Sequence, residues 1–228
     1  MDSDFVKFPR TPHLFWLSRE APRGDKVLPP DKAADLLRWP TSVEEKLDGA
    51  CLGISVGEGG TLRAQNRGSY LVPGGHPQFR RLWPWLAERQ VALEKVLGHS
   101  LILFGEWCFA RHTAAYDALP DWFLAFDVYD RKAERFWSRE RRDELAGEIG
   151  IATVPLLTTG LVDRAGIEHL FGRSRFGPEP MEGVYLRWDD GDWLAARAKV
   201  VRRDWVQPDE EHWSRRAITP NRLEVGRS

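Results

Sequence analysis

The sequence has few cysteines and no long apolar run. Its two cysteines, Cys51 and Cys108, lie far apart and form neither a CxxC motif nor a cysteine–histidine pattern. Structural zinc and a disulfide framework are therefore not indicated. The first residues lack the basic and then apolar pattern of a secretory signal, and no apolar stretch approaches the length that spans a bilayer. We expect a soluble, cytoplasmic protein with no membrane partner.

The sequence also lacks an excess of either charge. Its 33 Lys and Arg are balanced by 34 Asp and Glu, which gives a net charge of −1. This balance excludes a uniformly basic coat for nucleic acid, but it is compatible with a local basic groove. Aromatic residues, in contrast, are plentiful: 11 Trp and 11 Phe can fill a core and leave rings for stacking. The 228 residues suffice for one large domain or two small ones.

Short apolar patterns predict strands along much of the chain. The expected strands lie within residues 43–72, 101–109, 122–129, 181–186 and 194–201, with a hairpin turn at 57–60. The expected helices cover residues 78–97, 138–149 and 163–172, with Ser138 and Asp163 as N-caps, and a short helix capped by Asp31 and reaching Leu37. Pro84 either kinks the helix at 78–97 or marks where it begins. The proline-rich residues 1–40 predict a strap over the core, and residues 206–228 a loose charged tail.

The stretch Glu45-Lys46-Leu47-Asp48-Gly49 places a lysine between the end of a strand and an Asp-Gly turn. A lysine amine that projects into a pocket there is a candidate nucleophile once positive charge or desolvation lowers its pKa. Taken alone, the position favours a solvated surface lysine, because most lysines beside turns are of that kind.

Charged residues also interrupt the other apolar strands, namely Glu106, Asp127, Glu182 and Lys199. A buried charge without a partner is costly, so these residues either form internal salt bridges or line a polar cleft. A cleft with both charge signs suits a nucleotide with Mg²⁺, because carboxylates can bind the metal and ribose while cations hold the phosphates.

Six short motifs, in their usual order, resemble those of the covalent nucleotidyltransferases, which include polynucleotide ligases and mRNA-capping enzymes. The likeness is greatest to the RNA ligase 2 branch. The motifs are Lys46-Leu47-Asp48-Gly49, Gln65-Asn66-Arg67-Gly68, Phe104-Gly105-Glu106, Phe123-Leu124-Ala125-Phe126-Asp127, Glu182-Gly183-Val184 and Arg197-Ala198-Lys199. Each motif alone is weak, and their order carries the resemblance. The opening at residues 9–14 is also similar to bacterial members, so the resemblance covers most of residues 9–205.

The resemblance implies a role for each motif. Lys46 becomes adenylylated, Arg67 contacts the nucleotide sugar or phosphates, Glu106 binds the ribose, Phe126 stacks on adenine, Glu182 supports metal and nucleotide, and Arg197 and Lys199 hold the phosphates. Glu45 is placed at the nucleotide, Asp127 at the metal with Glu182, and Lys46, Glu182 and Lys199 form the catalytic set. We expect Lys199, Arg197 and bound Mg²⁺ to favour the neutral amine of Lys46.

The implied fold is α+β: a nucleotidyltransferase (adenylation) domain over residues 1–205, with antiparallel sheets around a nucleotide cleft and flanking helices. The implied function is an ATP-dependent RNA ligase of RNA repair. It would seal 5′-phosphate and 3′-hydroxyl ends through a lysyl-AMP intermediate and an adenylylated 5′ end, with ATP and Mg²⁺ or Mn²⁺ as cofactors. The expected partners are RNA ends or a nicked duplex, together with an end-healing or RNA-binding protein.

Two positions depart from the family pattern. Arg197 replaces a common lysine but keeps the charge and adds bidentate geometry. Cys51 stands where related ligases often carry a polar residue near the phosphates, and a thiol is a poor substitute. The alternatives are therefore a DNA ligase, a GTP-using capping enzyme, or a nucleotide-binding module impaired in catalysis.

Two groups of residues have open roles. His112, Tyr116 and Asp117 follow Glu106 and either touch an RNA end or only order their loop. Near the C-terminus, basic and aromatic residues either grip a nucleic-acid backbone or form a plain charged tail. They are Arg202, Arg203, Trp205, Trp213, Arg215 and Arg216.

Overall fold

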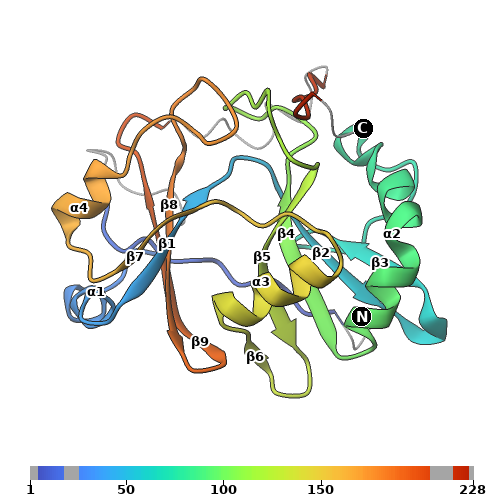
Figure 1. Cartoon of the computed structure of the whole chain (residues 1–228), viewed down its shortest axis with the longest axis horizontal. Helices are drawn as coiled ribbons and strands as arrows, with labels where there is room; N and C mark the ends of the chain where they lie inside the picture. Colours follow the sequence, from blue (N-terminus) through green and yellow to red (C-terminus); the bar gives the residue numbers. More distant parts are fainter. Residues whose placement is uncertain (1–4, 18–25, 206–217, 226–228) are drawn as a thin grey trace.

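The computed structural model describes residues 5–17, 26–205 and 218–225. Its strands form two antiparallel sheets that lie next to each other (Figure 1). Sheet A has the order β7-β1-β8-β9, with β7 at Leu156–Gly160, β1 at Thr41–Lys46, β8 at Gly183–Asp190 and β9 at Trp193–Val201. Sheet B has the order β3-β2-β4-β5-β6, with β3 at Leu62–Gln65, β2 at Ala50–Val56, β4 at Leu101–Trp107, β5 at Phe123–Asp130 and β6 at Arg135–Phe136.

The helices flank the two sheets. They are α1 (Pro30–Leu37), α2 (Leu82–Leu97), α3 (Arg139–Glu148) and α4 (Arg164–His169), with 3₁₀ turns η1 (Glu58–Gly60) and η2 (Pro77–Phe79). In Figure 1, α1 and α4 lie outside sheet A, α2 lies outside sheet B, and α3 lies in front, between the sheets. The expected α+β class, with antiparallel sheets and flanking helices, is confirmed.

Each sheet has its own apolar core on its outer face. Val43 of β1 packs with Ile167 of α4 in one buried cluster, and Leu52 of β2 packs with Leu93 of α2 in another. Since alternate side chains of a strand point to opposite faces, Lys46 of β1 and Cys51 of β2 point toward the space between the sheets. The alternation explains why charged residues interrupt otherwise apolar strands.

Strand pairing brings separate motifs together at one end of the sheets. The β1–β8 register aligns Lys46 with Gly183, directly after Glu182. The β2–β4 register pairs Cys51 with Glu106. Three motifs that are distant in sequence therefore meet beside the turn at Asp48.

The helix boundaries correct several expectations. Helix α2 begins at Leu82 instead of residue 78, because the turn η2 precedes it, and Pro84 lies in its first turn, where its missing N–H costs no hydrogen bond. Asp31 is not a cap, because α1 begins at Pro30 and Asp31 falls in its first turn. The N-caps of α3 and α4 are as predicted: Ser138 Oγ accepts from Arg141 N at 3.5 Å, and an Asp163 oxygen accepts from Gly166 N at 2.7 Å.

The two terminal regions are partly folded onto the core. Residues 11–14 lie beside β9, where Lys199 N donates to Pro12 O at 2.9 Å and Leu14 N donates to Lys199 O at 2.8 Å. The expected loose tail is wrong for residues 218–225, since Asn221 is only 4% exposed. Arg202 pairs with Asp204, and Arg203 donates to the Leu17 carbonyl. Trp213, Arg215 and Arg216 lie outside the described residues.

Within the part of the chain that the structure describes, no helix combines the length and apolar character needed to cross a bilayer.

Candidate active site

Lys46 ends β1 at a pocket of about 480 Å³ between the sheets. The lining includes residues from four motifs, among them Lys46, Arg67, Glu106 and Glu182, together with Cys51. The chain segments that carry them come from both sheets, so the pocket exists only when the sheets are assembled. Four of the predicted site residues therefore share one cavity.

Lys46 and Glu182 form an ion pair at the base of this pocket. Lys46 Nζ lies 2.7 Å from Glu182 Oε2, and the side chains are 24% and 2% exposed, respectively. Burial alone would lower the pKa of Lys46, but the carboxylates of Glu182, Glu106 and Asp48 outweigh it, so the pKa is raised. Without nucleotide, the amine is therefore held protonated.

This result corrects the expectation that Arg197 and Lys199 favour the neutral amine. Arg197 is engaged by Asp127, and Lys199 acts on Glu182, where it opposes the rise in that carboxyl's pKa caused mainly by burial. The local balance around Lys46 is negative because three carboxylates surround one lysine.

The pKa of Glu106, another residue of the pocket lining, is also raised. Its Oε1 accepts a hydrogen bond from Gly49 N at 3.0 Å. Burial raises the pKa of Glu106 to about 7; Lys46 and Arg67 oppose this rise, and Glu182 and Asp48 add to it. The carboxyl therefore changes its charge near neutral pH.

This shift predicts a pH-dependent stability. Because the folded pKa of Glu106 lies above its ordinary value of 4.5, the folded state binds the proton more tightly, and stability falls as pH rises from about 4.5 to about 7. Glu106→Gln removes the penalty, so its Tm should exceed that of the parent by about 2–4 °C at pH 8 and by less at pH 5. Thermal unfolding between pH 5 and 8 tests this, with Glu58→Gln, an exposed carboxylate outside the pocket, as control. A difference in Tm that is constant across this pH range would contradict the assignment.

Asp48, in the turn after Lys46, forms hydrogen bonds with the loop that follows β4. Its Oδ2 accepts from the backbone N–H groups of Thr113 and Ala114, at 2.6 and 2.8 Å. Its own backbone N–H donates to the Tyr116 hydroxyl at 2.8 Å. The loop brings His112 into the pocket lining, with Nε2 at 3.2 Å from Gln78 Oε1. Tyr116 thus has the loop-ordering role, and His112 lies where a substrate can touch it.

Glu45 does not reach the pocket. Its side chain is 1% exposed and accepts from Ser174 Oγ at 2.5 Å and from Arg175 N at 2.9 Å. Because neighbouring side chains of a strand point to opposite faces, Glu45 faces away from the side on which Lys46 lies. Its expected contact with the nucleotide is therefore not supported for the side chain.

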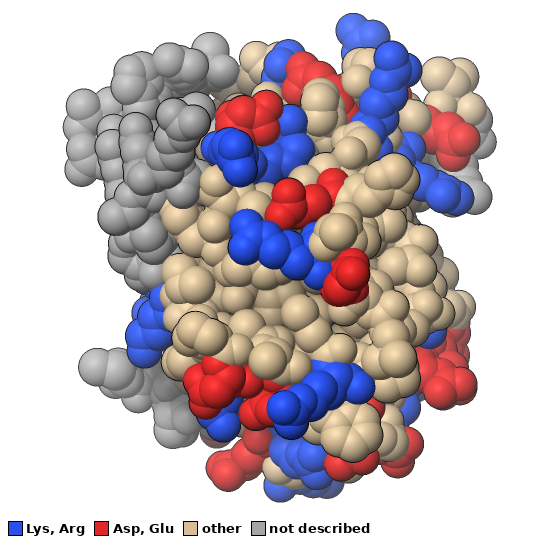
Figure 2. Space-filling view, turned by 90° about the vertical axis from the view of Figure 1, so that its left-hand side faces the viewer, with Lys and Arg blue, Asp and Glu red and all other residues tan. Residues whose placement is uncertain are grey.

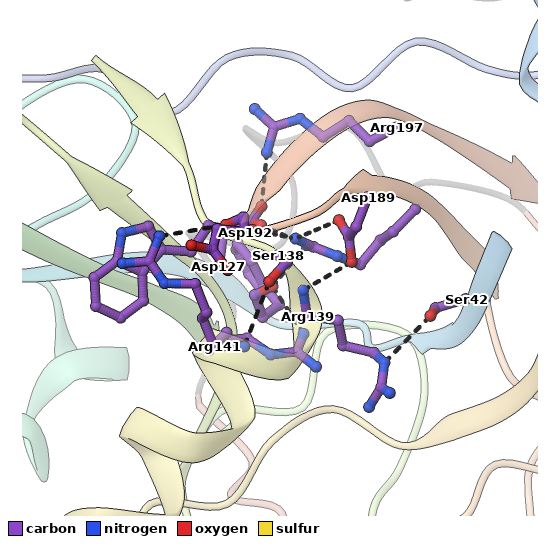
Figure 3. A network of polar contacts seen from close by, with 12 residues as sticks. Ser42, Asp127, Ser138, Arg139, Arg141, Asp189, Asp192 and Arg197 are labelled. Atoms are coloured by element: carbon purple, nitrogen blue, oxygen red, sulfur yellow. Dashed lines mark hydrogen bonds and ion pairs between the residues drawn. The ribbon is translucent and has the colours of Figure 1, made fainter. Parts of the chain in front are cut away.

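Asp127 also lies outside the pocket lining, in a buried cluster of ions (Figure 3). Its side chain is fully buried; Oδ1 pairs with Arg187, and Oδ2 lies 2.6 Å from Arg197 Nη1. Arg187 additionally donates to the carbonyls of Phe126 and Trp137, both at 3.0 Å. Both carboxylate oxygens are engaged, so the expected metal role of Asp127 is not supported and the internal salt bridge is the arrangement found.

The half-buried Phe126 ring lies against the N-terminal strap and is not among the residues that line the pocket. It packs against Phe8, with ring centroids 5.2 Å apart and planes at 64°. Phe8 is 3% exposed and also contacts Phe104, at 4.9 Å between centroids. The sequence did not reveal Phe8 as a neighbour of Phe126, because nothing in residues 5–14 indicates which sheet they cross.

Cys51 lines the pocket as a neutral thiol. Burial, with a contribution from Glu106, raises its pKa to about 12, and the nearby Arg67 opposes the rise. A neutral thiol gives a phosphate only a weak donor. The sequence-based concern about this position is therefore consistent with its surroundings.

The carboxylates of the pocket suit a metal ion that is bound jointly with a nucleotide better than one held by protein side chains alone. In the described ranges, no three His, Cys, Asp or Glu side chains are grouped so as to hold a metal ion. Glu182 and Glu106 offer two carboxylates in a site with surplus negative charge. Mg²⁺ commonly binds through one or two carboxylates, several waters and substrate phosphates. The donor set thus suits Mg²⁺ or Mn²⁺ that arrives with a nucleotide.

Comparison with known proteins gives a consistent result. The RNA ligase family model matches residues 40–201. A solved mutant of Naegleria gruberi RNA ligase with ATP and Mn is similar at 16% identity and a TM-score of 0.67, covering 88% of this chain and 57% of that one. The same ligase with PPi matches at 16% identity and a TM-score of 0.64, with the same coverage. The chain thus spans a little over half the length of these proteins. Among curated proteins, no sequence matches the chain.

Proposed function

The chain belongs to the RNA ligase family, and from this premise we propose that it is an ATP-dependent RNA ligase that joins a 5′-phosphate end to a 3′-hydroxyl end. The observation that carries the proposal is the 2.7 Å pair of Lys46 with Glu182, set in one pocket with Arg67 and Glu106. The Naegleria structures hold ATP, AMP or PPi, which are the substrate, transferred group and leaving group of such a reaction.

In the first step, the neutral Lys46 amine attacks the α-phosphorus of ATP. A P–N bond forms, the P–O bond to pyrophosphate breaks, and the lysine loses its proton. Whatever neutralises Glu182 and Glu106 removes the two largest interactions that raise the pKa of Lys46, and burial then favours the neutral amine. The Lys46 amine is thus protonated in the empty pocket, and its pKa falls once Glu182 and Glu106 are neutralised.

Other residues hold the substrates. Glu182 and Glu106 would hold Mg²⁺ or Mn²⁺, which when bound supplies positive charge against the phosphates. Arg67 lies at the open side of the pocket, where its guanidinium can bind phosphate oxygens. Lys199, which lies on β9, partly compensates the negative charge of Glu182. Phe126 is assigned to the base, with Phe8 supporting the ring from behind.

The later steps use the lysyl-AMP. A 5′-phosphate oxygen of RNA attacks its phosphorus, which breaks the P–N bond and leaves an adenylylated 5′ end. The 3′-hydroxyl then attacks the 5′ phosphorus, forms the phosphodiester and releases AMP.

The face that carries α1 and α4 shows Lys/Arg and Asp/Glu side chains interspersed (Figure 2). The exposed Arg67 in the pocket lining is the group to which we assign RNA binding, and an end-healing or RNA-binding protein is proposed as a further partner.

Covalent labelling tests the first step. Purified protein incubated with α-labelled ATP and Mg²⁺ should form an acid-labile labelled band that chases into RNA bearing a 5′-phosphate. Labelling from α-labelled ATP should persist in excess GTP, and α-labelled GTP should give no band; a band from α-labelled GTP but not from α-labelled ATP would indicate a capping enzyme. Nicked duplexes that differ only in the sugar of the 3′-hydroxyl strand separate RNA from DNA preference. Binding of ATP without a covalent band would favour an impaired nucleotide-binding module, with Cys51, a neutral thiol, as the suspect position.

A further inference from the structure

The segment 218–225, which we call the C-terminal segment, pairs with residues 108–119, which we call the pocket loop. The backbone hydrogen bonds between them run from one end of the loop to the other. They join Arg111 N to Thr219 O at 2.8 Å, Asn221 N to Phe109 O at 2.9 Å, Arg222 N to Tyr116 O at 2.9 Å, Leu119 N to Arg222 O at 3.0 Å, and Glu224 N to Leu119 O at 2.9 Å. Residues that follow the last strand thus help to set the shape of the loop, together with Phe176 and Glu179, which also accept hydrogen bonds from its backbone.

Asn221 is the centre of this pairing. Its side chain is 4% exposed, with Oδ1 accepting from Tyr116 N at 2.9 Å. Its Nδ2 donates to Cys108 O at 2.8 Å and to Ala110 O at 3.4 Å. One amide therefore satisfies a donor and two acceptors on both arms of the pocket loop. A side chain with only acceptors or only apolar atoms cannot make this set of bonds.

The opposite side of the same loop holds the nucleophile's turn. Thr113 and Ala114 donate to Asp48 at 2.6 and 2.8 Å, and the Tyr116 hydroxyl accepts from Asp48 N at 2.8 Å. Asp48 is two residues from Lys46. Tyr116 is thus in contact with Asn221 through its backbone and with the turn through its side chain, and it is 2% exposed.

We propose that Asn221 is a positioning residue of the active site: acting through Tyr116 and the pocket loop, it fixes the turn at Asp48 and with it the direction of the Lys46 amine. In-line attack on phosphorus needs close alignment, so a displaced turn slows the chemical step more than it weakens binding of ATP. The activity part of this inference rests on the proposed function, whereas the positioning of the turn does not.

Asn221→Asp tests the proposal with little change in shape. The variant keeps the acceptor for Tyr116 N but turns a carboxylate oxygen toward two carbonyl oxygens, which repel it. We expect the amide hydrogens of Asp48, Thr113 and Ala114 to exchange at least about tenfold faster. We also expect the rate of Lys46 adenylylation at saturating ATP to fall at least about tenfold, with a smaller change in the KM for ATP.

Two further variants make the result decisive. Ser138→Ala removes the N-cap of α3, away from the loop, and should reproduce a modest loss of Tm without faster exchange at Asp48. Tyr116→Phe removes only the hydroxyl that accepts from Asp48 N, and stands in if Asn221→Asp does not fold. The double variant Asn221→Asp/Tyr116→Phe should lose less adenylylation rate than the product of the two single fold-losses. Both substitutions interrupt the same chain of contacts, so their effects are not independent.

Each outcome has one meaning. Normal exchange at Asp48, Thr113 and Ala114 in both Asn221→Asp and Tyr116→Phe would overturn the proposal, as would an adenylylation rate no lower than that of Ser138→Ala. If the unsubstituted protein forms no lysyl-AMP, the proposed function fails, but the exchange measurement still decides whether Asn221 holds the turn.

Discussion

Lys46→Ala is expected to abolish covalent adenylylation, with a loss of at least about 10³-fold. The amine of Lys46 is the group proposed to form the P–N bond, and no other lysine lines the pocket among the described residues. Lys46→Arg should be equally inactive, because a guanidinium stays protonated and cannot act as a nucleophile at neutral pH. The measurement is the initial rate of label transfer from α-labelled ATP to the protein.

The control for this prediction is Lys95→Ala, which removes an exposed lysine from α2. It should label at the parent rate. Glu182 loses its partner in Lys46→Ala, and its pKa should rise further because burial already raises it. It can therefore become neutral, so the variant should fold and still bind ATP. An undiminished labelled band from Lys46→Ala would remove Lys46 from the mechanism.

Asp127→Ala is expected to destabilise the fold by about 3–5 kcal/mol, because it removes the carboxylate that Arg187 and Arg197 share and leaves Arg187 only the more distant Asp189, at 3.8 Å. Arg187 is fully buried and Arg197 is 11% exposed on its side chain, so water cannot replace Asp127. The free energy of unfolding, measured by denaturant titration, checks the effect. For a chain of this length it corresponds to a fall in Tm of roughly 10 °C.

Two comparisons isolate the buried charge. Glu168→Ala removes the exposed partner of Arg164 and should cost no more than about 1 kcal/mol. Adding Arg187→Met to Asp127→Ala should recover part of the loss, because the uncompensated charge is replaced by an apolar chain of similar length. A loss for Asp127→Ala as small as that for Glu168→Ala would mean that the cluster has little effect on stability.

Lys46, Arg67, Glu106 and Glu182, which the motifs single out, line one pocket, and their site roles stay predictions. The motifs could not show that Lys46 points into the pocket while Glu45 points away from it. That difference depends on which face of β1 meets the other sheet. The β-strand alternation would have shown the difference had the buried side been known.

The electrostatics were harder to predict than the positions. Counting cations in the motifs suggested a lowered pKa for Lys46, whereas the fold surrounds it with carboxylates and raises it. Arg187 belongs to no motif, so the partner that takes Asp127 away from the metal was not visible in the sequence. Likewise, the charged composition after residue 205 hid Asn221, whose role depends on contacts with residues 108–116.

The pairing of Leu14 with Lys199 has a consequence for the order of folding. It joins an early part of the chain to a late one, so the entropy of closing a very long loop must be lost before the contact forms. On a ribosome, residues 11–14 would emerge long before β9, so the backbone groups of Pro12 and Leu14 that bond Lys199 would be left to water until β9 appears. Folding of this part must therefore follow synthesis, and we expect it to be slow for a protein of this size.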